Sequence, residues 1–247
     1  MINTIMLDCG GVVTYPLTGE WMMAPGLDEL KAKYNFTIDE ERAREGLKKN
    51  IHFVDEGQLI TGFKHELECR IRFTNAMSEF LGVKLEEADV MKMVRFQTYD
   101  DSKYQLYEDS IPGVRRLSEK YRVGFVSNAM PSMIRALINT GLCDELSFFT
   151  VSCLIGCQKP EEGIFLKALE EAGAKPEECV FVEDIGANLF AAGRLGIRQI
   201  RMMRDHYLTW ALPDFEWHGA VAHDLAEVEK LVEAHNLGER EIPLCRE

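Results

Sequence analysis

Five short apolar runs recur along the chain, and none of them alternates between polar and apolar residues. Strands of a parallel sheet that is covered by helices on both faces have this continuous apolar character. The runs occupy residues 2–7, 123–126, 148–151, 179–182 and 197–202. We therefore expect them to form the strands of one buried parallel sheet.

Four helical segments lie between the later runs, and most of their ends carry clear signals. Prolines open the first three segments, and a glycine directly follows each of the last three. Proline suits the first turn of a helix and glycine the position just past its end. The segments are residues 112–120, 131–140, 160–172 and 187–195. Alternating strands and helices predict an α/β fold, with a Rossmann-like doubly wound parallel sheet and right-handed crossovers.

Residues 16–103 interrupt this alternation and are predicted to be almost entirely helical. Apolar residues at three-to-four spacing favour helices at 61–81 and 85–97. Thr37 and Glu40 match a capping box that would open a helix at 38–50.

The chain is thus expected to divide into a core and an inserted cap. The core comprises residues 1–15 and 104–247, and the helical cap comprises residues 16–103. Hinges are expected near residues 14–18 and 100–108, where the chain passes between the two parts. The polar segment 238–247 is expected to fray.

The charge of the chain limits its partners. Its 41 acidic and 28 basic residues give a formal net charge of −13, the wrong sign for binding nucleic acid or an anionic membrane through general attraction. No apolar stretch approaches the roughly 18 residues of a membrane span, and the segment MINTIMLDCGG is unlike the basic leader expected of a secretory signal. Seven scattered cysteines without a C-x-x-C pair favour reduced thiols. We expect a cytoplasmic protein, as a monomer or a homodimer.

Short polar groups follow three of the predicted strands. Asp8 follows the first run, Ser127 and Asn128 the second, and Glu183 and Asp184 the fourth. Ligands of open α/β sheets bind at the carboxyl ends of the strands, so these groups should face one crevice. Lys159 lies just before a predicted helix and would add the cation that such an acidic pocket needs to hold a phosphate.

The segments LDCGGVV, GFVSNA, CQKPEEGIF and VFVEDIGANLFAAGRLG resemble the four ordered motifs of the haloacid dehalogenase-like hydrolase superfamily. The resemblance covers about residues 1–14 and 105–203, and the helical insertion stands where subfamily I carries its C1 cap. The D-x-G-G-V form of the first motif is similar to a branch with sugar-phosphate phosphatases and the amino-terminal domain of some epoxide hydrolases.

The resemblance implies roles for the residues of the crevice. Asp8 would be the nucleophile that attacks phosphorus and forms an aspartyl-phosphate. Ser127 and the backbone amide of Asn128 would bind phosphoryl oxygens. Lys159 would bridge the nucleophile and the phosphate and balance the developing charge. The substrate would be a small phosphorylated metabolite of the sugar-phosphate kind.

The resemblance also implies a magnesium site. Asp184 would bind Mg²⁺ directly, Glu183 through water, Asp8 through one carboxylate oxygen and Gly10 through its main-chain carbonyl. Asn188, one helical turn past Asp184, would steady the acidic loop.

One position departs from the superfamily's phosphatases, which usually carry a second aspartate two residues after the nucleophile. That aspartate protonates the leaving group, and here the position is Gly10. A general acid–base contributes about 10²–10⁴-fold. A good leaving group, solvent, or a cap residue such as His52 or Glu56 would have to compensate. A Gly10→Asp change is expected to restore the acid if the new carboxyl is well placed.

Three alternatives to a phosphatase remain open at this point. A 2-haloacid dehalogenase needs neither the acid nor a metal, although the intact Glu183–Asp184 pair argues against it. A phosphonoacetaldehyde hydrolase would use a cap lysine as a Schiff base, with Lys49 beside His52 as the candidate. A catalytically weak binding or regulatory protein on the same fold is the third.

Overall fold

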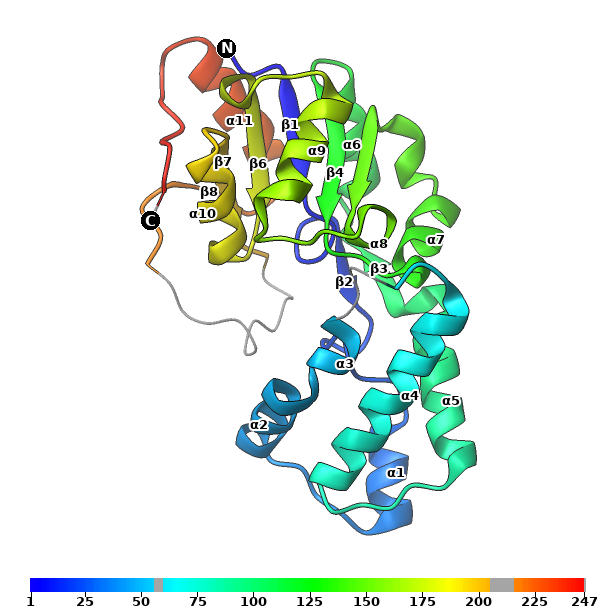
Figure 1. Ribbon diagram of the computed structural model, residues 1–247. Coiled ribbons are helices and arrows are strands. Elements are labelled where there is room, and N and C mark those ends of the chain that lie inside the picture. Colours follow the sequence, from blue (N-terminus) through cyan, green and yellow to red (C-terminus); the bar gives the residue numbers. More distant parts are fainter. Residues whose placement is uncertain (56–59, 205–215, 247) are drawn as a thin grey trace.

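The computed structural model describes residues 1–55, 60–204 and 216–246, and Figure 1 shows a core above a smaller group of helices. The core has a six-stranded sheet in the order β5-β4-β1-β6-β7-β8. Every neighbouring pair of strands in this sheet is parallel. The strands are β1 (Thr4–Leu7), β4 (Arg122–Ser127), β5 (Phe148–Val151), β6 (Cys179–Glu183), β7 (Arg198–Met202) and β8 (Ala220–Ala222).

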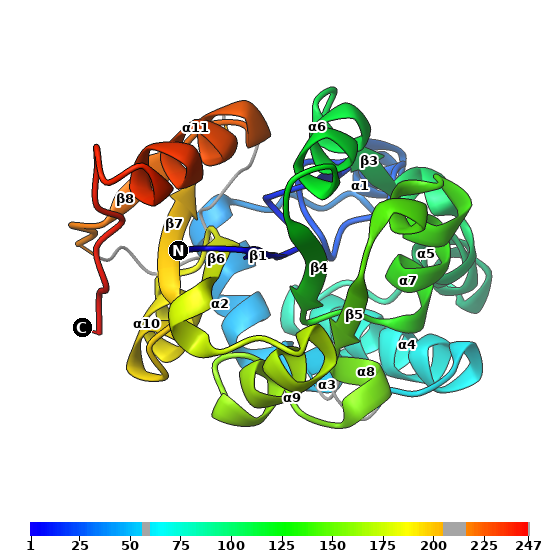
Figure 2. The same ribbon diagram turned by 90° about the horizontal axis from the view of Figure 1, so that it is seen from above.

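Helices cover both faces of this sheet, as Figure 2 shows from above. α6 (Ser110–Ser118) and α11 (Leu225–Asn236) lie on one face, and α9 (Glu162–Ala172) and α10 (Gly186–Arg194) lie on the other. The predicted fold class, an α/β doubly wound parallel sheet, is confirmed. Burial explains why the strands have no polar face: all four residues of β1 and all five of β6 are buried.

A further core helix is α7 (Pro131–Asn139), and α8 (Ser152–Ile155) is a single helical turn. The 3₁₀ turns are η2 (Asp101–Lys103) at the end of the helical insertion, and η3 (Leu142–Glu145) and η4 (Pro176–Glu178) in the core.

The five predicted strands are all present, and the differences lie at ends and edges. The helix expected from Pro160 begins at Glu162 instead, because the backbone of Lys159 is held outside the helix by Asn128. The short edge strand β8 was not predicted, and neither was α11.

The expected fraying of the carboxyl-terminal segment is wrong for the residues described there. Ile242 is fully buried, and Cys245 exchanges two backbone hydrogen bonds with the side chain of Gln199, at 2.7 and 3.0 Å. The segment lies against α10, where a Cβ at Gly193 would collide with the carbonyl oxygen of Cys245.

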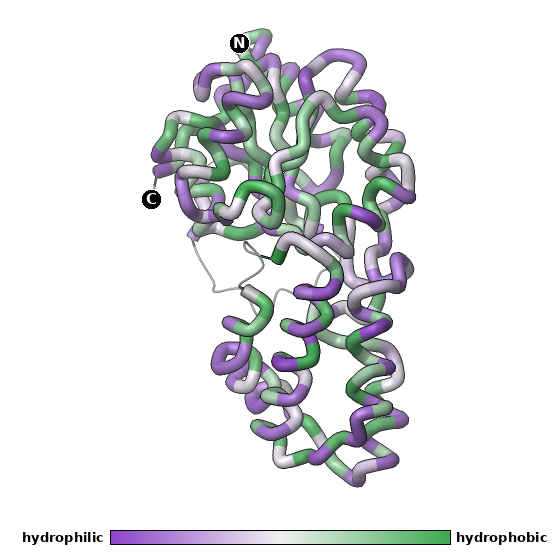
Figure 3. Tube along the Cα trace, turned by 45° about the vertical axis from the view of Figure 1, so that its right-hand side comes forward, coloured by the Kyte–Doolittle hydropathy of each residue, from purple (hydrophilic) through white to green (hydrophobic). Residues whose placement is uncertain are grey.

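The cap consists of helices at the positions expected for the insertion. They are α1 (Leu27–Tyr34), α2 (Glu40–Asn50), α3 (His52–Asp55), α4 (Phe63–Phe80) and α5 (Glu87–Tyr99). Figure 3 shows hydrophilic and hydrophobic stretches alternating along these helices, as expected when each has one side packed and the other in solvent. None of the described helices is long and apolar enough to cross a membrane.

The predicted capping box of α2 is wrong. The N-cap residue is Asp39, whose carboxylate accepts the backbone N–H of Arg42 at 2.8 Å. Asp is as good an N-cap as Thr. Because Asp39 rather than Thr37 caps the helix, α2 starts at Glu40, two residues later than predicted.

The two passages between core and cap pair with each other. β2 (Thr14–Pro16) and β3 (Tyr104–Leu106) form a two-stranded antiparallel ribbon. The ribbon lies within both of the expected hinge segments, and hinge motion there stays a prediction.

Candidate active site

The chain brings the predicted polar residues together at the carboxyl edge of the sheet. β1 lies between β4 and β6, so Asp8 at the end of β1 stands between Ser127 and Glu183. Asp8, Ser127 and Glu183 are all buried. Neighbouring parallel strands end at one edge, which explains why residues more than 170 positions apart in the chain meet here.

Lys159 joins the two sides of this site. Its Nζ lies 2.7 Å from Oδ1 of Asp8 and 2.6 Å from Oε2 of Glu183, and its side chain is only 2% exposed. Burial by itself would lower the pKa of Lys159, but the charges of Asp8 and Glu183 outweigh burial and raise that pKa. Lys159 therefore carries a fixed positive charge next to Asp8.

Both carboxylate oxygens of Glu183 accept hydrogen bonds from neighbouring groups. One of its oxygens accepts from Lys159 and, at 2.9 Å, from Nδ2 of Asn188, and the other accepts the backbone N–H groups of Asp184 and Ile185. Burial would raise the pKa of Glu183, but Lys159 and these donors outweigh burial and lower it. Glu183 is thus a buried carboxylate that organises the loop after β6.

Asp184 has one carboxylate oxygen that is paired neither by a hydrogen bond nor by Lys159 among the described residues. Its Oδ2 is buried and finds no hydrogen-bond donor among the described residues. Burial, and then the charge of Glu183, raise the pKa of Asp184 well above its usual range. The same two causes raise the pKa of Asp8 to about 6. Oxygens of Asp8, Glu183 and Asp184 all lie within 4.8 Å of one another.

Gly11 allows Asp184 to lie this close to the loop after β1. Its φ of +71° is in the left-handed region, and a Cβ there would stand 2.4 Å from Oδ2 of Asp184. A larger residue would therefore push the acidic loop away. Gly11 was not predicted as a site residue, although the sequence shows two adjacent glycines shortly after Asp8.

Asn128 has a further contact that the sequence analysis did not predict. Its side-chain Nδ2 donates to the carbonyl oxygen of Lys159 at 2.9 Å, and its Oδ1 accepts the backbone N–H of Lys159 at 2.8 Å. These two hydrogen bonds fix the backbone of Lys159 and so direct its ammonium group toward Asp8.

Gly10 follows Asp8 by two residues and lies next to the indole of Trp21. A Cβ at Gly10 would stand 3.1 Å from Cζ2 of the indole, which is tighter than most carbon contacts in proteins. Trp21 comes from the turn between β2 and α1, on the cap side of the ribbon. The contact between Gly10 and Trp21 was not predicted from the sequence.

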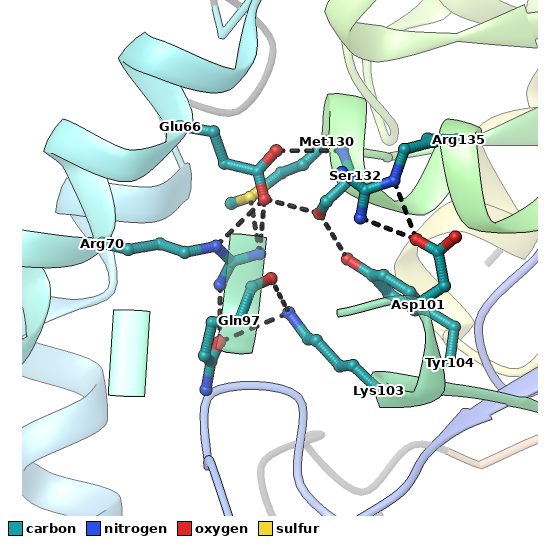
Figure 4. A network of polar contacts seen from close by, with 9 residues as sticks. All are labelled: Glu66, Arg70, Gln97, Asp101, Lys103, Tyr104, Met130, Ser132 and Arg135. Carbon is teal, nitrogen blue, oxygen red and sulfur yellow. Dashed lines mark hydrogen bonds and ion pairs between the residues drawn. The ribbon is translucent and has the colours of Figure 1, made fainter. Parts of the chain in front are cut away.

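A buried polar network fastens the cap to the core beside the site (Figure 4). Glu66 of α4 accepts the backbone N–H of Ser132 at 2.9 Å and pairs with Arg70 at 2.8 Å. Ser132 lies in the first turn of α7, whose free N–H groups favour a carboxylate. Arg70 also donates to Gln97 of α5 at 2.7 Å, and Gln97 accepts from Lys103. We call Glu66, Arg70, Gln97, Lys103 and Ser132 the cap latch.

The cap residues predicted to assist chemistry are exposed or lie outside the described residues. His52 and Lys49 are both exposed; the His52 ring packs 4.1 Å from that of Phe53, and Nζ of Lys49 lies 5.4 Å from the ring centre of Phe80. An exposed lysine of this kind lacks the burial that activates a Schiff-base lysine. Glu56 lies outside the described residues.

Comparisons with known proteins bear on the family and on the fold. A family model for haloacid dehalogenase-like hydrolases matches residues 2–196. A curated glyceraldehyde 3-phosphate phosphatase of Methanopyrus kandleri is 31% identical over 130 residues, which cover 48% of this chain and 56% of that protein. The chain thus spans little more than half the length of this curated relative.

Solved structures share the fold at low identity. The L-2-haloacid dehalogenase of Xanthobacter autotrophicus superposes with a TM-score of 0.66 at 17% identity, over 95% of this chain and 99% of that one. A haloacid dehalogenase-family enzyme of Bacteroides thetaiotaomicron gives 0.58 at 22% identity, over 85% and 97%. At these identities the likeness concerns the fold alone.

Proposed function

The chain belongs to the haloacid dehalogenase-like hydrolases, and we propose that it is a Mg²⁺-dependent phosphatase of a small phosphorylated metabolite, with sugar phosphates as the substrate class. The observation that carries the proposal is the buried, unpartnered Oδ2 of Asp184 beside Asp8 and Glu183. Three carboxylates around a single lysine leave net negative charge in a buried place, which calls for another cation.

The residues present fit a magnesium ion. Mg²⁺ prefers oxygen ligands and is usually held by one or two carboxylates together with substrate phosphate. Asp8 and Asp184 would hold it, with Gly10 offering its main-chain carbonyl, while Glu183 is already occupied by Lys159 and backbone donors. A bound Mg²⁺ would supply charge neutralisation for the transferring phosphoryl group.

In the proposed reaction, an oxygen of Asp8 attacks phosphorus. A new bond forms between that oxygen and phosphorus, and the bond to the ester oxygen breaks with its electron pair staying on the leaving oxygen. Lys159, at 2.7 Å from Asp8, stabilises the negative charge of the transferring group. Ser127 would donate to a phosphoryl oxygen. Water then attacks phosphorus, which releases inorganic phosphate and restores Asp8.

Asn188 and Asn128 would act by positioning. Asn188 holds Glu183, which in turn holds Lys159, and Asn128 holds the backbone of Lys159. These contacts support a site in which the ammonium group keeps its place while Asp8 becomes phosphorylated.

A 2-haloacid dehalogenase is the second candidate, because Gly10 supplies no leaving-group acid and a halide needs none. The structural neighbour from Xanthobacter autotrophicus bears that name. Displacement of halide needs no metal, however, and so gives no reason for the unpartnered Asp184. The glyceraldehyde 3-phosphate phosphatase relative also favours the phosphatase.

A substrate panel tests the proposal. Phosphorylated sugars, nucleotides and acids, and 2-chloropropionate, are assayed with Mg²⁺ and with a chelator. We expect phosphate release that requires Mg²⁺ and is lost in Asp8→Asn, since an amide does not attack phosphorus. Asp144→Asn, at an exposed aspartate of η3, is the matched control and should keep full activity. Metal-independent halide release would favour the second candidate instead.

A further inference from the structure

Gly10 has no backbone reason to be glycine. Its φ lies outside the left-handed region, so an ordinary residue could adopt the same conformation, in contrast to Gly11 with its φ of +71°. What limits position 10 is space. A Cβ there would stand 3.1 Å from Cζ2 of Trp21 and 3.7 Å from two further atoms of the indole. The direction that a side chain would take from residue 10 is therefore filled by Trp21.

The indole of Trp21 is fixed in place by its packing contacts. Its indole packs against the hydrophobic core cluster, and its ring centre lies 6.1 Å from that of Tyr104 in β3. The turn that carries it is closed by its own hydrogen bonds: the hydroxyl of Thr18 donates to the carbonyl oxygens of Glu20 and Met23, at 2.9 and 3.2 Å. Moving the indole aside would disturb packing on both the core and the ribbon.

The resemblance to the family's phosphatases implies that residue 10 is the position from which an acid would protonate the leaving group. Building on the function proposed above, we propose that Trp21 is a specificity-determining residue that excludes an acid from this position. With the indole there, the enzyme acts on phosphate esters whose leaving oxygen is a weak base.

The fate of the leaving oxygen explains why the enzyme would prefer esters of weakly basic leaving groups. When Asp8 attacks phosphorus, the bond to the leaving oxygen breaks and that oxygen keeps the electron pair. No carboxyl at residue 10 supplies a proton, so the oxygen departs as an anion and takes its proton from water afterwards. Rates should then fall steeply as the pKa of the leaving alcohol rises.

The test uses Gly10→Asp, Trp21→Ala and the double variant on a series of aryl and alkyl phosphates with Mg²⁺. Gly10→Asp alone should raise alkyl phosphate turnover by less than about threefold, because the indole blocks the carboxyl. The double variant should exceed Trp21→Ala on alkyl phosphates by up to about 10²-fold and depend less on leaving-group pKa. Gly10→Ala in both backgrounds is the control, because it adds the Cβ without an acid and should gain nothing.

Two results would overturn the proposal. A large gain on alkyl phosphates from Gly10→Asp alone would show that Trp21 does not exclude the acid. A folded double variant with no gain over Trp21→Ala would show that Trp21 is not what keeps the position empty.

A second measurement separates this proposal from the proposed function. Gly10→Ala should lower the melting temperature in the wild-type background and should lower it less when Trp21 is alanine, which is the coupling expected of two residues in contact. Equal shifts in the two backgrounds would overturn the contact, whatever the activity. A wild-type enzyme that releases no phosphate from any ester, with this coupling intact, would instead refute the proposed phosphatase.

Discussion

At the scale of single residues, the site carries more negative charge than its own lysine can balance. Asp8, Glu183 and Asp184 are all buried, and Lys159 pairs with only the first two. Asp184 is left with a raised pKa and an unpartnered oxygen among the described residues. Repulsion between the buried carboxylates therefore destabilises the site, and a bound cation should reduce this repulsion.

Asp184→Asn tests this electrostatic repulsion directly. The amide keeps the shape and removes one like charge, so the metal-free variant should be more stable than wild type by on the order of 1 kcal/mol at pH 7. Mg²⁺ should raise the melting temperature of wild type and barely change that of the variant. Asp144→Asn should behave as wild type in both measurements. A variant that Mg²⁺ stabilises as strongly as wild type would remove Asp184 from the metal site.

The raised pKa of Asp8 predicts a dependence of stability on pH. The pKa rises from 3.8 to about 6 on folding, so between these values the folded chain holds more protons on Asp8 than the unfolded chain. The free energy of unfolding contributed by Asp8 should therefore fall as pH rises through this window, by at most about 3 kcal/mol. Urea unfolding of metal-free wild type and Asp8→Asn from pH 4 to 7 measures the difference. Parallel curves for the two proteins would contradict the shift.

The sequence identified most residues of the site but not how their side chains are directed. Asp8, Ser127, Lys159 and Glu183 follow from strand ends and motif order, and the structure brings them together. The indole of Trp21 over Gly10 does not follow, because it depends on how a turn of the cap folds back onto the core. A contact between a loop and a glycine leaves no periodic signal.

At the scale of elements, the cap latch connects α4 and α5 to the start of α7, directly after the loop with Ser127 and Asn128. Glu66 and Arg70 show at sequence level only as a pair four residues apart on a helix. Such pairs are usually exposed and weak, whereas this one is almost fully buried. The strands could be predicted from the apolar runs, because strands buried on both faces consist of apolar residues. A buried ion pair leaves no comparable pattern in the sequence.

Glu66→Gln should therefore be costly. It leaves the buried guanidinium of Arg70 without its carboxylate, and we expect a loss of roughly 3–5 kcal/mol in the free energy of unfolding. Adding Arg70→Met should recover part of this loss. Glu170→Gln, which breaks the exposed pair with Lys167, should change stability by less than about 0.5 kcal/mol. Equal small effects at both positions, read from urea unfolding, would show that the latch does not hold the cap.

At the scale of the whole molecule, the candidate site lies at the carboxyl edge of the sheet, and the cap latch joins the inserted helices to the core. The helical character of the insertion was predicted from the break in strand–helix alternation, and the domain boundaries stay a prediction. The β2–β3 ribbon was not predicted, because three-residue strands carry too little pattern. The ribbon and the cap latch are the connections through which the cap must move if it closes over the site.

In the proposed reaction Asp8 becomes phosphorylated during turnover, and this aspartyl-phosphate can be trapped. The enzyme is mixed with an ester that it hydrolyses and Mg²⁺, quenched in acid, digested and examined by mass spectrometry. We predict a phosphoryl adduct on the peptide that contains Asp8, absent when a chelator replaces Mg²⁺ and absent in Asp8→Asn. Undiminished turnover by Asp8→Asn, with no adduct on that peptide in wild type, would contradict the account.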